Sequence, residues 1–394
     1  MRIIIAPDSY KGSLSALEAA EAMADGLGRV FPEAEIIKTP IADGGEGTVE
    51  ALTVATGGRI KYSAASDPLG REIRAAWGLL GDGRTAVIEM AAASGLPLLR
   101  PEERDPQRAS TFGSGELLRA VLDEGLPRLI IGLGGSATND GGAGFASALG
   151  ARFLDGRGRE LPPGGAALTG LKEIDLSGLD PRLKNLEILV ACDVDNPLCG
   201  PKGASAVFGP QKGADPATVR ELDAALANFG RLAEAATGRK VMERPGAGAA
   251  GGFGAGLLFF TEARLRPGIE LILEIIDFER LAAEADLIVT GEGLTDYQTA
   301  YGKAPVGVAE AARKYDIPVI GLSGGLGRGY EDVLERGISA LMPCPPGPMT
   351  LEECLAAGKD QVAEAAERLG RLLRAGQQLG RKSIDPGGKI SGRS

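Results

Sequence analysis

Short apolar runs that end in loops bearing glycine, aspartate or serine alternate with helical stretches along most of the chain. This alternation is typical of parallel α/β architecture, and runs that are apolar throughout predict strands covered on both faces. The strands that we expect are Arg2–Ala6, Leu129–Leu133, Glu187–Ala191, Asp286–Thr290, Pro318–Leu322 and Ile338–Met342.

Helix starts are marked by their own chemistry. Capping boxes at Ser15 and Thr350, each with a glutamate three residues later, predict the starts of the first helix and of the last long helix. Asp215 followed by a proline predicts the start of a helix over Ala217–Ala236.

The segments Arg59–Ser66, Glu72–Leu80 and Thr85–Met90 alternate only partly and contain a turn at residues 81–84. This antiparallel hairpin character is foreign to a doubly wound sheet. We therefore predict two α/β domains, in which a flavodoxin/Rossmann-like doubly wound domain (1–61 and 283–375) is interrupted by an inserted α/β domain (62–282). The tail, 376–394, is rich in glycine and basic residues and is expected to be disordered.

The chain of 394 residues contains no histidine, which excludes Ser-His-Asp hydrolases and imidazole bases. A base must then be a carboxylate, a lysine, a tyrosine or a thiol. The net charge of −10 argues against nucleic acid as a partner. No apolar stretch reaches 18 residues, which predicts no membrane span, and the four cysteines lack CxxC spacing. We expect a soluble cytoplasmic protein.

Polar loops follow several of the expected strands, where ligands bind in open α/β sheets. Asp8, Ser9 and Lys11 follow the first strand; an aspartate there can bind Mg²⁺ or accept a proton, and a lysine can hold an anion. Residues 290–303 repeat the pairing of acids with a lysine, through Glu292, Asp296 and Lys303. In both places a turn with solvated side chains is the alternative.

Two glycine-rich loops have the character of phosphate cradles, because glycine lets backbone N–H groups approach an anion closely. The first holds Gly44, Gly45 and Gly47 beside Asp43 and Glu46, and these acids favour a divalent cation. The second holds Gly134, Gly135, Ser136, Thr138, Asn139 and Asp140. It is neither a Walker A sequence nor a dinucleotide fingerprint.

Asp193 and Asp195 follow another apolar run, and Lys212 lies shortly after. Either aspartate can bind a metal or deprotonate a hydroxyl group, and two turn-forming aspartates before a proline are the alternative. The run Pro245–Gly256 is almost entirely glycine and alanine. We expect it to pack a helix closely against its neighbours.

These blocks together resemble the bacterial class I glycerate kinase family, over residues 3 to about 325. The matching blocks are IAPDSYKGSLSA, IADGGEGT, SDPLGR, IEMAAASGL, GLGGSATNDGGAG, ACDVDNPLCG, FGPQKGA, PGAGAAGGFGAGL and VTGEGLTDYQTAYGKAPVGVA. The resemblance implies ATP- and Mg²⁺-dependent phosphorylation of D-glycerate, with 2-phosphoglycerate as the general product, in glyoxylate and sugar-acid metabolism. It also implies two α/β domains, one of them interrupted. The chain departs from the family at Leu294, where an arginine is usual.

With that resemblance, the roles can be assigned as expectations. ATP phosphates would lie on the two glycine loops, with Asp43 and Glu292 as metal ligands. The substrate, between the domains, would contact Lys11 or Lys303 together with Ser9, Asp296 and Lys212. Asp193 is the first choice of general base and Asp8 the second.

Two other functions stay open. A strand followed by Asp-x-Asp at Asp193 is also similar to haloacid dehalogenase-type phosphatases, and Leu294 favours a ligand-binding or sensory relative without turnover. The oligomeric state, a homodimer included, is not determined by these residues.

Overall fold

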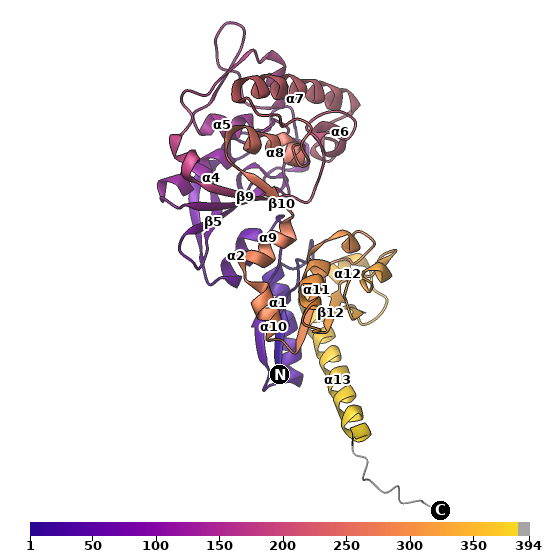
Figure 1. The fold of residues 1–394 in the computed structure, drawn as a ribbon. Helices are drawn as coiled ribbons and strands as arrows, with labels where there is room; N and C mark the ends of the chain where they lie inside the picture. Colours follow the sequence, from indigo (N-terminus) through magenta and orange to yellow (C-terminus); the bar gives the residue numbers. More distant parts are fainter. Residues whose placement is uncertain (385–394) are drawn as a thin grey trace, which may run out of the picture. The chain divides into compact units, whose positions relative to one another are not determined.

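The computed structural model describes residues 1–384 and divides the chain into two compact units. Among the described residues, the terminal unit consists of Met1–Ile41 and 277–384, and the inserted unit is Ala42–Ile276 (Figure 1). The inserted unit begins well before residue 62 because helix α2 (Thr48–Ala55) packs on its sheet, where Gly78 leaves room for the Thr53 side chain. Helix α10 (Phe278–Ala283) packs on α11 (Ala304–Arg313) and so belongs to the terminal unit.

The terminal unit contains a five-stranded parallel sheet. Its strands are β1 (Arg2–Ile5), β2 (Glu35–Lys38), β11 (Leu287–Glu292), β12 (Val319–Ser323) and β13 (Ala340–Pro343), in the order β13-β12-β11-β1-β2. Renumbered within the unit, this is the 2-1-3-4-5 order of doubly wound folds such as flavodoxin. The strand order reverses between β1 and β11, and ligands bind at the carboxyl ends of strands at such a point. The α/β class is confirmed.

Two long helices pack together on this sheet's flank. Helix α1 (Ala16–Val30) begins at the expected capping box, and α13 (Gly358–Ile384) lies against it so closely that a Cβ on Gly26 would lie 2.0 Å from the Ala363 carbonyl oxygen. The capping box at Thr350 opens only the short α12 (Leu351–Ala356), not the last long helix.

The expected disordered tail is wrong for residues 376–384, which continue α13. Gln, Leu, Arg and Lys residues there favour a helix, which forms despite Gly376 and Gly380. The rest of that expected tail, 385–394, lies outside the described residues.

The inserted unit contains a mixed sheet of six strands in the order β10-β9-β6-β5-β4-β3. These are β3 (Arg59–Ser66), β4 (Glu72–Leu79), β5 (Thr85–Glu89), β6 (Arg128–Gly132), β9 (Glu187–Ala191) and β10 (Arg264–Arg266). As expected, β4 runs antiparallel to both its neighbours, whereas β5, β6, β9 and β10 are parallel. The carboxyl ends of β3, β5, β6 and β9 therefore share one edge. Strands β7 (Arg152–Leu154) and β8 (Glu173–Asp175) form a separate pair.

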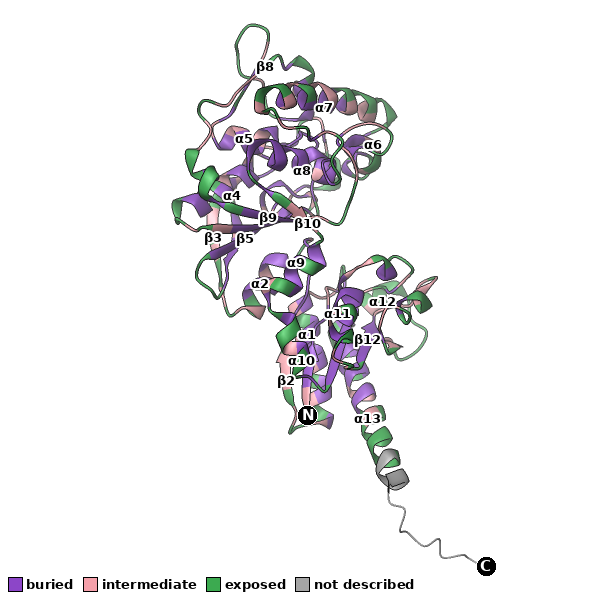
Figure 2. Cartoon of the chain, in the orientation of Figure 1, coloured by how far each residue is buried: buried purple, intermediate pink, exposed green. Residues whose placement is uncertain are grey.

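The helices of this unit are mostly short. Besides α2, they are α3 (Ala91–Ser94), α4 (Phe112–Asp123), α5 (Ala143–Ala148), α6 (Ala204–Phe208), α7 (Pro216–Thr237), α8 (Ala249–Phe260) and α9 (Gly268–Ile275). The glycine-alanine run forms the start of α8, which is almost wholly buried (Figure 2). Gly251, at φ +70°, lies against Thr138, whose carbonyl oxygen would be 1.9 Å from a Cβ there. The run therefore serves close packing.

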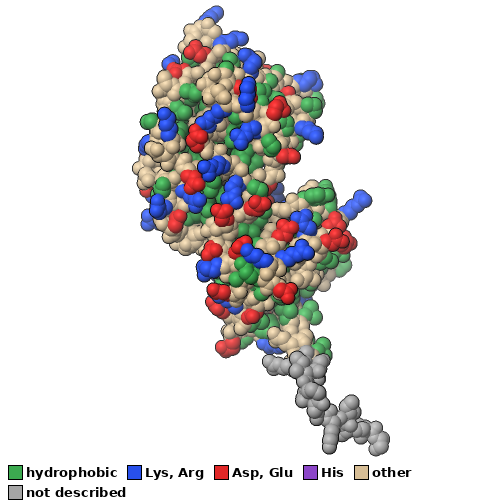
Figure 3. Space-filling model, in the orientation of Figure 1, with side chains coloured by type: hydrophobic (Ala, Val, Ile, Leu, Met, Phe, Trp, Pro, Cys, Tyr) green, Lys and Arg blue, Asp and Glu red, His purple; other side chains and the backbone are tan. Residues whose placement is uncertain are grey.

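The face of the molecule in Figure 3 mixes basic and acidic side chains rather than collecting one sign. Over residues 1–384, no helix combines the length and the apolar character needed to cross a membrane.

Candidate active site

The two glycine loops meet in the inserted unit. The Gly134 N–H donates to the Gly44 carbonyl oxygen at 3.2 Å, and a Cβ on Gly134 would lie 2.5 Å from the Gly45 Cα atom. Gly44 also contacts Ala191 at the end of β9, where a Cβ would meet the Ala191 Cβ at 2.5 Å. The loops thus lie together over the carboxyl ends of β6 and β9, and larger side chains would separate them.

Asp193 lies beside these loops, two residues beyond the end of β9. Its Oδ1 accepts the Gly268 N–H, in the first turn of α9, at 2.7 Å. Partial desolvation, together with the Asp43 and Glu270 carboxylates, raises the pKa of Asp193 to about 6. The residue is nevertheless exposed to solvent. An accessible carboxylate with a pKa near neutrality is suited to accept a proton from a bound hydroxyl group.

Glu89, at the end of β5, was not among the residues singled out from the sequence. Its Oε1 accepts the Val49 N–H at 2.7 Å, and burial raises the pKa of Glu89 to about 7. The bond fixes the start of α2, and therefore the loop that contains Gly44 and Gly45. The signal available in the sequence was a carboxylate at the end of an otherwise apolar strand.

The second glycine loop is divided by burial. Gly134 and Gly135 face solvent in part, whereas Thr138, Asn139 and Asp140 are at most 1% exposed. The Asp140 carboxylate accepts bonds from the Thr111 N–H at 2.8 Å and from the N–H groups of the following glycines, Gly142 and Gly144. Burial raises the pKa of Asp140, and these bonds oppose that rise. In this structure the Asp140 carboxylate bonds to the protein, whereas the buried Thr138 Oγ1 and Asn139 Oδ1 have no hydrogen-bond partner among the described residues.

Lys212 is also inside the inserted unit, with 1% of its surface exposed. Its Nζ donates to the Thr138 carbonyl oxygen at 2.6 Å, and burial lowers the pKa of Lys212 to about 7. Asn139 donates to the Ser205 Oγ at 2.9 Å. The structure therefore joins Lys212 to the glycine loop and does not leave it open to a substrate.

In the terminal unit, the loop after β1 lies at the point where the strand order reverses. Asp8 Oδ1 accepts the Ser9 N–H at 2.6 Å, and Lys11 is exposed. Tyr10, which the sequence did not mark, anchors this loop: its hydroxyl group donates to the Leu322 carbonyl oxygen of β12 at 2.7 Å. Burial raises the pKa of Tyr10 well above its ordinary value, so the phenol stays protonated.

Glu292 ends β11 in the same unit and is 6% exposed. Its Oε1 accepts the hydroxyl groups of Thr299 at 2.7 Å and Thr295 at 3.1 Å. Burial raises the pKa of Glu292, and the Lys303 ammonium opposes that rise. Asp296 accepts the Gln298 N–H at 2.9 Å, which is the bond of a turn.

Leu294, on the same loop, is 52% exposed.

In the described part of the chain, no group of three or more His, Cys, Asp or Glu side chains is arranged to hold a metal ion.

The comparisons with known proteins agree over nearly the whole chain. The model of the glycerate kinase family matches residues 3–374. A glycerate kinase of Bacillus subtilis is 54% identical over 96% of this chain and 98% of its own, and a glycerate 2-kinase of Escherichia coli is 47% identical over 96% and 99%. The crystal structure of a protein described as glycerate kinase 2 from Salmonella typhimurium LT2 matches with a TM-score of 0.86 and 49% identity, over 96% of this chain and 99% of that one. The chain therefore belongs to the glycerate kinase family and is an enzyme of that type.

Proposed function

We propose that the enzyme transfers the γ-phosphoryl group of ATP to a hydroxyl group of D-glycerate. The products are ADP and phosphoglycerate, specifically 2-phosphoglycerate. The carrying observation is the meeting of the two glycine loops, at Gly134 and Gly44, beside the carboxylate of Asp193. Backbone N–H groups in glycine loops stabilise phosphate charge, and phosphoryl transfer requires mainly such positioning and charge stabilisation.

In this proposal Asp193 is the general base. A glycerate hydroxyl oxygen forms a bond to the γ-phosphorus atom while the bond to the ADP oxygen breaks, and the hydroxyl proton passes to Asp193. With a pKa of about 6, the carboxylate is mostly ionised at pH 7 and still basic enough to accept that proton. Asp8, at the strand-order reversal of the terminal unit, is the alternative base.

The residues present fit a Mg²⁺ ion that accompanies ATP. Magnesium takes oxygen ligands, commonly one or two carboxylates together with substrate phosphates. Asp43 supplies a partly exposed carboxylate next to Gly44 and Gly45, whereas Glu292 is buried and bonded to two threonines. Asp43 is therefore the better ligand of the two, and when bound the ion would neutralise phosphate charge.

Substrate contacts are proposed for Ser9, Lys11, Asp296 and Lys303, which follow strand ends of the terminal unit and are partly or fully exposed. Among them, the cationic Lys11 and Lys303 suit the carboxylate of glycerate. Lys212 is proposed to act indirectly, by holding the second glycine loop through its bond to the Thr138 carbonyl oxygen.

The test is a coupled assay of ADP release with ATP, Mg²⁺ and D-glycerate, with the product hydroxyl identified by phosphorus NMR. Glycerate-dependent ADP release with the 2-phosphate as product supports the proposal. Release of phosphate from phosphoesters without ATP would instead indicate a phosphatase. Glycerate binding without turnover would indicate a sensory protein.

A further inference from the structure

A cavity of about 880 Å³ lies in the inserted unit, and its lining contains none of the residues given a role above. Its lining includes the turn after β3, the start of α4, helix α5 and residues 160–168. This volume is in the range of pockets that hold cofactors and other small ligands. The turn contains the SDPLGR block, to which the proposed reaction assigns no role.

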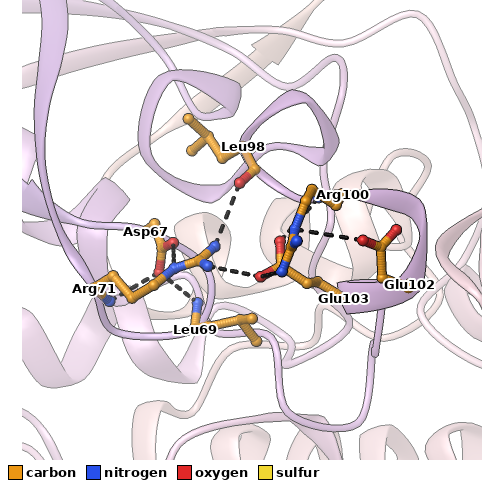
Figure 4. Close-up of polar contacts among 7 residues, drawn as sticks. All are labelled: Asp67, Leu69, Arg71, Leu98, Arg100, Glu102 and Glu103. Atoms are coloured by element: carbon orange, nitrogen blue, oxygen red, sulfur yellow. Dashed lines mark hydrogen bonds and ion pairs between the residues drawn. The ribbon is translucent and has the colours of Figure 1, made fainter.

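The turn after β3, which lines one side of the cavity, is connected by ionic contacts to residues 100–103 (Figure 4). The buried Asp67 accepts the N–H groups of Leu69 at 2.8 Å and Arg71 at 2.9 Å, and it pairs with the Arg71 guanidinium. That guanidinium also reaches Glu103 at 2.8 Å, and Arg100 contacts the same carboxylate at 3.1 Å. The two arginines lower the pKa of Glu103 to about 2, so this carboxylate is ionised at physiological pH.

The cavity adjoins the second glycine loop through Asp140. This carboxylate binds the N–H groups of Thr111, which lies between the lining residues Ser110 and Phe112, and of Gly144, which lines the cavity itself. Both segments that border the cavity are therefore fixed by the last residue of the loop proposed to cradle phosphates.

The lining suits a ligand that is partly apolar and carries hydroxyl groups. Leu69, Phe112 and Leu161 supply apolar surface, and the hydroxyl groups of Ser110 and Ser147 supply polar contacts. Arg108 is exposed at the cavity, and over residues 1–384 its guanidinium has no ion-pair partner. An arginine plane of this kind can stack on an aromatic base.

Acidic groups of the lining disfavour a ligand that is anionic throughout. Asp67 is paired with Arg71, and Glu160 with Arg152 at 2.9 Å. Among the described residues, the Asp105 carboxylate accepts only the Gln107 N–H, at 3.0 Å, and it keeps acceptor capacity for a hydroxyl group. Carboxylates bind ribose hydroxyl groups in this manner in dinucleotide-binding folds.

We propose that this cavity binds the adenosine end of ATP, with Arg108 against the base and the phosphates extending toward the second glycine loop. The inference rests on the proposed function, because that function supplies ATP as the ligand. It assigns nucleotide affinity to residues that take no part in phosphoryl transfer.

The experiment measures ADP and tripolyphosphate binding by calorimetry for the full-length protein and three variants. Ser147→Phe places a ring in the cavity, Arg108→Ala removes the unpaired guanidinium, and Arg104→Ala is the control, since Arg104 is exposed in the same segment but does not line the cavity. We expect the first two variants to weaken ADP binding by about tenfold or more, because each removes or obstructs the stacking of the base on the Arg108 guanidinium. Arg104→Ala should bind ADP like the wild type, and tripolyphosphate binding should be unchanged in all three.

Wild-type ADP affinity in folded Arg108→Ala and Ser147→Phe would overturn the proposal. Equal losses for ADP and tripolyphosphate would also overturn it, because they would place the effect on the phosphate loop. Should Ser147→Phe fail to fold, Arg108→Ala decides, because its side chain is on the surface. The measurement requires no turnover, so absence of glycerate-dependent ADP release by the wild type would contradict the proposed function alone.

Discussion

Replacing Asp193 with asparagine tests the proposed base most directly. Asparagine keeps an oxygen that can accept the Gly268 N–H, now at 2.7 Å, so the start of α9 should stay in place. It cannot accept the substrate proton. A general base contributes about 10²–10⁴-fold, or about 3–5 kcal/mol of activation free energy, and we expect kcat to fall by that factor.

The pH dependence of kcat/KM gives an independent test of Asp193 as the general base. The carboxylate is the active form, so activity should rise as the pH rises through the pKa of about 6. The ionised fraction is about 91% at pH 7 and about 9% at pH 5, which predicts a roughly tenfold loss of kcat/KM at pH 5. An aspartate with an ordinary pKa of about 3.9 would lose almost nothing over that range.

The assay is steady-state ADP release from pH 5 to pH 8, with circular dichroism to verify folding. Asp195→Asn is the matched control, because Asp195 is exposed in the same loop, and its kcat should stay within about twofold of the wild type, as for most surface substitutions. A folded Asp193→Asn enzyme with near wild-type kcat would refute the assignment. So would an acidic limb that persists unchanged in that variant, which would point to another carboxylate.

Three further substitutions probe the packing around the loops. Tyr10→Phe removes the bond to the Leu322 carbonyl oxygen and should cost about 1–3 kcal/mol of stability, measured by urea unfolding. Gly251→Ala should cost more than about 2 kcal/mol in thermal unfolding, because its Cβ would lie 1.9 Å from the Thr138 carbonyl oxygen at a positive φ. Lys212 has a pKa lowered to about 7, so between pH 7 and about 10 the unfolded chain binds more protons and wild-type stability rises with pH. Lys212→Met should lower the slope of unfolding free energy against pH by about 1.4 kcal/mol per pH unit, measured by urea unfolding at pH 7 and pH 9. An unchanged slope would contradict burial of the Lys212 amino group.

Local sequence patterns were sufficient to locate most of the sheet. The apolar runs at residues 129–133, 187–191 and 286–290 form β6, β9 and β11 within a residue or two at each end, because a strand covered on both faces must be apolar along its whole length. The hairpins over residues 59–90 were also expected from their partial alternation. Element ends depended on neighbours: α13 extends to Ile384, whereas composition predicted a tail.

For the candidate site, too, some features could be predicted from local sequence and others could not. The sequence was sufficient to predict which loops follow strands. It also indicated Asp193 as a candidate base, because an acidic residue after an apolar strand can be recognised from the sequence alone. Whether a polar side chain faces a ligand or the protein was not visible. The sequence predicted Asp140 and Lys212 as ligand-binding residues. In the structure both are buried, because they bond to residues distant in the sequence, Thr111 and Thr138 respectively.

By itself, then, the sequence determined the α/β class, the family resemblance and the carboxylate character of any base, since a chain without histidine has few alternatives. Only the tertiary structure decided which carboxylates have raised pKa values, because desolvation and neighbouring charge are properties of three-dimensional surroundings. It also decided the roles of Glu89 and Tyr10, whose partners lie 40 and 312 residues away along the chain. Contacts over such separations are set by sheet order and packing, which residue patterns within a short window do not encode.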